Sequence, residues 1–181
     1  TDTGRVFSGP PPPPQDRTTP AAAGPVPSAR ILRAALAVQL ALFAAQLIIG
    51  IVVNLYVKVP DVHPGSASGS PTTGYLGDLG AVLAWALTAG PVPLTLHVVL
   101  AIVLIVIGLG LVPLARHGGP AQIILTTLAA ACTIGAAFNG GSFLIFGNND
   151  NLSSLIMESL STAAAACYVT VLVRAATAAV T

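Results

Sequence analysis

The stretch VPLTLHVVLAIVLIVIGLGLVPLARHGGP, residues 92–120, sets the fold class of this chain. Its apolar part, about 92–114, reaches the roughly 20 residues that an α-helix needs to cross the hydrocarbon core of a bilayer. Backbone polar groups must be paired internally in lipid, so such a run predicts a helix. The glycine-rich RHGGP that follows is typical of a turn, and the chain is apolar again from Ala121. The stretch therefore predicts a membrane-spanning helix that turns back into the next one.

Three further apolar runs of similar length occur, at about 34–57, 121–146 and 152–173. The composition favours lipid as the surrounding solvent, because 54% of the residues are hydrophobic and only 7% are charged, against about 25% charged in soluble domains. The formal net charge of +1 argues against nucleic acid as a partner. We therefore predict an all-α membrane protein whose residues 29–181 form a four-helix transmembrane bundle.

Lysine and arginine residues are distributed unevenly around the predicted spans. If the N-terminus is cytoplasmic, Lys58 alone lies on the external side. The basic residues on the cytoplasmic side are then Arg5, Arg17, Arg30, Arg33, Arg116 and Arg174. The positive-inside rule therefore predicts that both termini are cytoplasmic.

Two of the segments outside the predicted spans are long. Residues 1–28 are rich in Pro, Thr and Ala without hydrophobic periodicity, so we expect a disordered cytoplasmic tail. Residues 58–91 form the predicted external loop. Within this loop, LGDLGAVLAWALTAG (76–90) is apolar but too short to span a bilayer. It predicts a short external helix at the membrane interface, with Trp85 near the lipid headgroups.

The candidate site consists of polar residues in the predicted outer half of the spans: Asn54, His97, Asn139, Ser142 and Glu158. A carboxylate inside a bilayer costs about 2.5 kcal/mol or more unless it is partnered or near water. Small residues at helical spacing from these side chains, such as Gly50 and Gly135, are typical of helix–helix contacts in membranes. We therefore expect the five side chains to face inward and to meet in one polar cluster. That cluster is either a set of interhelical hydrogen bonds or a ligand or proton site.

The sequence contains no P-loop, HExxH, GxSxG or dinucleotide-binding motif. It therefore favours a non-enzymatic accessory subunit or small-molecule binder without a cofactor, whose partners are the lipid bilayer and other membrane subunits. The alternative is a haem-binding, b-type cytochrome-like electron-transfer protein with His97 as an axial ligand. His63 or Met157 would then supply the second ligand, because His117 lies about 30 Å along a helix from His97. A third hypothesis is an intramembrane enzyme with Glu158 and His97 as acid and base.

Three stretches carry a resemblance: LTLHVVLAI (94–102), FNGGSFL (138–144) and NLSSLIMES (151–159). Within a lysine-poor chain rich in Ala, Val and Leu, they resemble small four-span membrane proteins of high-GC, actinobacterial-type bacteria. The likeness covers the second to fourth spans. It implies the four-helix fold and a location in the bacterial cytoplasmic membrane, and it implies neither an activity nor any site residue.

Overall fold

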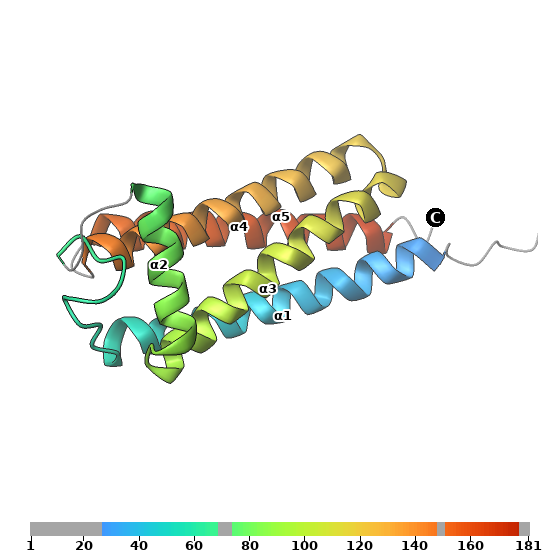
Figure 1. Ribbon diagram of the computed structural model, residues 1–181. Coiled ribbons are helices and arrows are strands. Elements are labelled where there is room, and N and C mark those ends of the chain that lie inside the picture. Colours follow the sequence, from blue (N-terminus) through green and yellow to red (C-terminus); the bar gives the residue numbers. More distant parts are fainter. Residues whose placement is uncertain (1–26, 69–73, 148–150, 178–181) are drawn as a thin grey trace, which may run out of the picture.

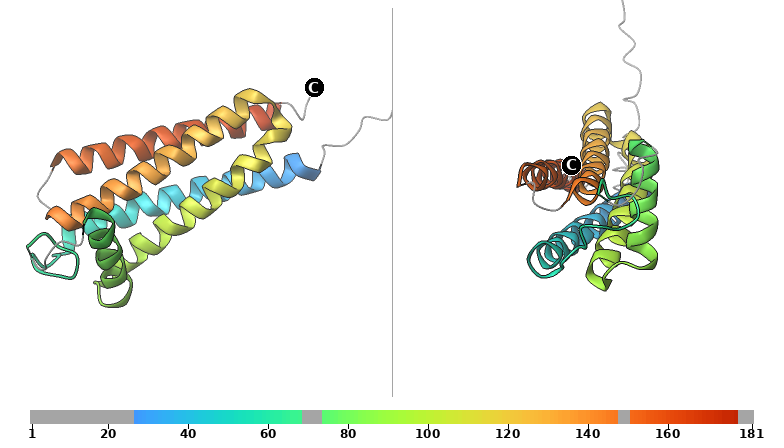
Figure 2. Two further views of the ribbon diagram at one scale, coloured as in Figure 1. Left: turned by 45° about the horizontal axis from the view of Figure 1, so that its top comes forward. Right: turned by 60° about the vertical axis from the view of Figure 1, so that its left-hand side comes forward.

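The computed structural model describes residues 27–68, 74–147 and 151–177 (Figure 1). Four long helices run side by side, and a shorter helix lies across one end of them (Figures 1 and 2). In chain order the helices are α1 (Pro27–Tyr56), α2 (Tyr75–Thr88), α3 (Val92–Ala115), the 3₁₀ helix η1 (Arg116–Gly118), α4 (Pro120–Phe146) and α5 (Asn151–Thr177). All regular secondary structure in the described ranges is helical, so the all-α prediction is confirmed.

Each long helix contains a segment that is long and apolar enough to cross a membrane. The four segments have mean hydropathies of 2.4, 3.0, 1.7 and 1.6 in chain order, and the first begins at Ala29. The helices extend beyond the predicted runs at several ends, most of all in α1, which begins at Pro27. Proline suits the first turn of a helix, because its fixed φ is helical and its missing N–H would have no partner there. The predicted tail, residues 1–28, lies almost entirely outside the described residues.

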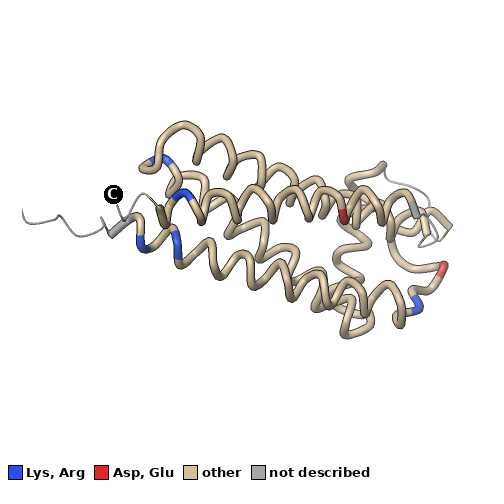
Figure 3. The backbone as a smooth tube through the Cα atoms, turned by 180° about the vertical axis from the view of Figure 1, so that it is seen from behind, with Lys and Arg blue, Asp and Glu red and all other residues tan. Residues whose placement is uncertain are grey.

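The two ends of the bundle differ in charge (Figure 3). We call one end the arginine end, because it carries Arg30, Arg33, Arg116 and Arg174 (Figure 3). The opposite end, the α2 end, carries Lys58 and Asp61 in the segment after α1. At the arginine end η1 joins α3 to α4, and Gly119 adopts a φ of 90° directly before Pro120 starts α4. Such a φ favours glycine, so this residue allows the tight reversal.

The main core lies between the long helices toward the arginine end. Its fully buried side chains include Leu36 of α1, Leu104 and Leu111 of α3, and Tyr168 and Val171 of α5. The rings of Phe43 and Tyr168 pack at a centroid distance of 5.9 Å. Helix α1 contacts α3 and α5, while α4 contacts α3 and α5, so the four helices form a closed cycle.

Helix α2 is held on α3 and α4 by a second apolar cluster at the α2 end. This cluster includes Val82 and Ala86 of α2, Leu94 and Val98 of α3, and Leu144 and Ile145 of α4. Thr95 donates a 2.8 Å hydrogen bond to the Ala86 carbonyl, and Tyr75 shares a 2.8 Å bond with Ser142. The Trp85 ring stacks on His63 at a centroid distance of 4.3 Å. The predicted short helix therefore exists, and it packs across the bundle end.

Candidate functional site

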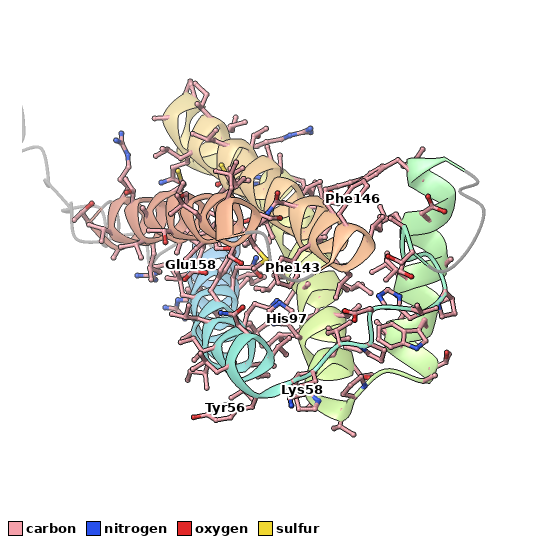
Figure 4. All side chains as sticks on the ribbon, turned by 90° about the vertical axis from the view of Figure 1, so that its left-hand side faces the viewer. Tyr56, Lys58, His97, Phe143, Phe146 and Glu158 are labelled. Carbon is pink, nitrogen blue, oxygen red and sulfur yellow. The ribbon has the colours of Figure 1, made fainter. Side chains whose placement is uncertain are left out.

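The most distinctive polar contact near the α2 end joins α1 to α3. Gln46 Nε2 lies 3.1 Å from His97 Nε2, and both residues are partly buried. Gly50 lies one turn after Gln46, and a β-carbon at that position would lie 3.0 Å from His97 Cε1. Glycine therefore lets the imidazole lie close against the backbone of α1. His97 projects into the middle of the bundle when it is viewed from the α2 end (Figure 4).

Each member of this pair retains a buried polar atom without a hydrogen-bond partner among the described residues. These atoms are Gln46 Oε1 and His97 Nδ1. The amide nitrogen only donates, so His97 Nε2 accepts and Nδ1 carries the ring proton. If the amide is turned by 180°, His97 Nε2 donates to the oxygen and Nδ1 accepts. In either arrangement the pair presents one free donor and one free acceptor.

A second buried polar group lies deeper in the bundle, where α1, α3 and α5 meet. Gln39 Nε2 donates a 2.9 Å hydrogen bond to the Leu104 carbonyl of α3. The Tyr168 hydroxyl faces Gln39 and Thr133, but it makes no hydrogen bond of normal geometry with the described residues. It also lies against the backbone of Gly108, where a β-carbon would be 2.7 Å from the hydroxyl oxygen. Gln39 and Tyr168 therefore bring α1, α3 and α5 into close contact through buried polar atoms.

Asn139 and Ser142, two of the predicted site residues, form contacts between secondary-structure elements. Asn139 Nδ2 donates to the Ser153 carbonyl, which joins α4 to α5. Ser142 bonds to the Tyr75 hydroxyl, which joins α4 to α2. Both residues line a hollow of about 150 Å³ between the ends of α4 and α5, whose other lining residues are mostly apolar.

Asn54 and Glu158 are exposed, although both were expected to be buried in helix packing interfaces. Glu158 lies on the side of α5 that faces α1 (Figure 4). Neither makes a hydrogen bond or an ion pair with another described residue. The five predicted residues therefore do not meet in one hydrogen-bonded cluster, because His97, Asn139 and Ser142 each bond to a different partner.

Gln46, Gln39 and Tyr168 are the polar residues that the sequence analysis did not include in the site. Gln39 and Gln46 are seven residues apart in an otherwise apolar run, which places them on one face of a helix, two turns apart. This spacing is the sequence signal that could have identified Gln39 and Gln46 as residues of a buried polar site. Gln46 is also one turn from Gly50, which had already been identified as a contact position.

The haem hypothesis stays a prediction, and the contacts of its candidate ligands do not support it. His97 Nε2 is bonded to Gln46, and its Cε1 edge is closed by Gly50. His63 lies in the segment after α1, where two contacts hold its ring. Its Nδ1 lies 3.1 Å from the Pro64 carbonyl, and its ring stacks on Trp85. Met157 Sδ lies over Gly140 of α4, where a β-carbon would be 3.3 Å away. Among the described residues, no group of three or more His, Cys, Asp or Glu side chains could hold a metal ion.

Comparison with known proteins adds no relative from which a role could be transferred. No family model, curated protein or solved structure matches the chain significantly. The site must therefore be interpreted from its own chemistry.

Proposed function

We propose that this chain is an integral membrane protein that crosses the bilayer four times, with the arginine end in the cytoplasm and α2 at the external interface. The large apolar side chains on its outer faces support this arrangement: Ile48 is 63% exposed, Val106 63% and Ile124 65%. Such faces are stable in lipid and promote aggregation in water. The four arginines of one end satisfy the positive-inside rule.

Within the membrane, we propose that the protein binds a small polar molecule at the Gln46–His97 pair. The observation that supports this function is the pair of buried atoms, Gln46 Oε1 and His97 Nδ1, that no described residue satisfies. Buried polar atoms in proteins are paired in the great majority of cases. Two unpaired atoms on neighbouring side chains are therefore a candidate point of attachment for a ligand.

The free atoms of Gln46 and His97 favour one chemical class of ligand. One free donor beside one free acceptor matches a group that both donates and accepts, such as a hydroxyl, a carboxamide or a protonated carboxyl. A charged ligand would have to be desolvated without a counter-ion, which is costly in apolar surroundings. The proposed ligand is therefore neutral, and the role we propose for the protein is binding without catalysis.

Nitrogen-15 NMR of the histidine rings tests this proposal directly. The full chain is reconstituted in lipid nanodiscs and titrated with acetamide, 1-octanol and octanoic acid, and the resonances of its three histidines are followed. We expect at least one probe to shift the Nδ1 resonance of His97, and we expect Gln46→Leu to abolish the shift. His117, exposed in the turn at the arginine end, is the internal control. Shifts of His97 and His117 by the same amount, or no shift of His97 with any probe, would refute the proposal.

A further inference from the structure

A second cavity lies at the α2 end, between the segment after α1 and the end of α4. Its volume is about 220 Å³, which is the volume of about seven water molecules in the liquid. Its polar lining includes Asp61, His63 and Ser68. Its apolar lining includes Val59, Ile145 and Phe146, and Phe146 lies at this end of the bundle (Figure 4). Neither Gln46 nor His97 lines this cavity, so it is separate from the pair described above.

The segment that forms one wall of the cavity is held against α2 and α4. The backbone N–H of Ala67 donates a 2.8 Å hydrogen bond to the Ile145 carbonyl at the end of α4. Gly65 packs on α2, where a β-carbon would lie 2.7 Å from the backbone nitrogen of Val82. Its φ of 82° also favours glycine. These contacts order the wall without a ligand, which lowers the entropy that binding has to cost.

The His63 ring is fixed so that one of its nitrogens remains free. Its Nδ1 lies 3.1 Å from the Pro64 carbonyl, which only accepts hydrogen bonds, so Nδ1 carries the proton of the neutral ring. One face of the ring stacks on Trp85. No described residue donates to Nε2, which keeps its lone pair. His63 therefore contributes a hydrogen-bond acceptor to the lining of the cavity.

Asp61 adds a negative charge to this lining. Its side chain is exposed and forms no hydrogen bond or ion pair with another described residue. Lys58 precedes it by three residues and is also exposed, but it forms no ion pair with Asp61 in the described structure. The Ser68 hydroxyl can accept a hydrogen bond as well. The polar lining thus combines one negative charge with several acceptors.

We propose that this cavity binds a small organic ammonium ion whose apolar part packs on Ile145 and Phe146. An ammonium group has three donors and no acceptor, which matches the acceptors of Asp61, His63 and Ser68. Its hydrogen bond to the Asp61 carboxylate is charge-assisted and therefore strong. The carboxylate would repel an anion. A bare metal ion would leave the apolar lining without a role, and no group of three or more described His, Cys, Asp or Glu side chains could hold one.

Tryptophan fluorescence measures this binding, because Trp85 is the single tryptophan of the chain and stacks on His63. The full chain in lipid nanodiscs is titrated at neutral pH with benzylammonium, and with benzyl alcohol and benzoate as neutral and anionic analogues of similar shape. Isothermal titration calorimetry provides a second measurement of affinity. We expect saturable binding of benzylammonium that weakens with added salt, because salt screens exposed charges. Equal binding of the three compounds, or no saturable binding of benzylammonium by either method, would overturn the proposal.

Three variants assign the binding to this cavity. Asp61→Asn should weaken benzylammonium binding by about fivefold or more, because it removes the charge from the pair. Glu158→Gln is the matched control, since it removes an exposed carboxylate elsewhere in the chain. Gln46→Leu alters only the other proposed site. Both controls should bind benzylammonium as the wild type does, and circular dichroism confirms that each variant is folded.

Two results with these variants would contradict the assignment. The first is a folded Asp61→Asn chain that binds benzylammonium as tightly as the wild type. The second is an equal loss of binding in Asp61→Asn and Glu158→Gln. Zinc ions are titrated in the same way, and a chain that binds zinc through Asp61 but does not bind benzylammonium would show a metal site in place of the proposed one.

Discussion

Replacement of Gly108 by alanine probes the tight contact between α3 and α5. The new β-carbon would lie 2.7 Å from the Tyr168 hydroxyl oxygen and 3.5 Å from Gln39 Nε2. Tyr168 and Gln39 are both fully buried, so neither can rotate away without displacing its neighbours. Overpacking of this kind costs about 1–3 kcal/mol. We therefore expect Gly108→Ala to destabilise the bundle.

Gly110 provides the matched control on the same helix. It is exposed, and nothing lies within 4 Å of a β-carbon at that position. Alanine is favoured over glycine in a helix by up to about 1 kcal/mol, and this gain is common to both variants. Their difference in unfolding free energy should therefore equal the cost of overpacking, which corresponds to roughly a 5- to 150-fold difference in the unfolding equilibrium.

Reversible unfolding in mixed micelles measures this difference. A Tyr168→Phe background removes the hydroxyl oxygen that the new methyl group would meet. In that background Gly108→Ala should cost less than it does in the wild type, which a double-mutant cycle detects. Equal stability of the Gly108→Ala and Gly110→Ala chains would show that α3 and α5 are not in close contact at this depth, and would refute the reasoning.

Two further predictions test the topology and the packing of α4 on α5. With the native thiols removed, an impermeant maleimide applied to intact cells should label a cysteine at Ser68 and spare one at Gly118; labelling at Gly118 would reverse the orientation that we propose. Asn139→Ala should lower the unfolding free energy by about 0.6–1.7 kcal/mol, because it removes the hydrogen bond to the Ser153 carbonyl. An unchanged free energy in micelle unfolding would contradict that assignment.

The sequence predicted the number and approximate limits of the long helices because each is marked by an apolar run of the length that a bilayer requires. It also predicted the short helix that contains Trp85. These features depend on local composition, so a single chain is enough to reveal them. The bounds were less accurate, as at α1, where Arg30 and Arg33 lie within the helix and not before it.

The arrangement of the site was much harder to predict, because it depends on how each helix is rotated about its axis. Asn54 and Gln46 both belong to α1 and lie eight residues apart, which leaves them about 80° apart on the helix. Only Gln46 meets His97, while Asn54 is exposed. The partner of Asn139 is a backbone carbonyl, a group that every residue carries and that no side-chain pattern can identify.

The short connection at η1 determines which motions the bundle allows. With three residues and Gly119 between them, α3 and α4 cannot slide past each other by one 5.4 Å turn unless η1 unwinds. We therefore expect α3 and α4 to move together. Helix α1 has no such short connection, since residues 57–74 separate it from α2. The contact between Gln46 and His97 joins α1 to α3, so a ligand bound at this pair would contact both the helix with the longer connection and the pair of helices joined by η1.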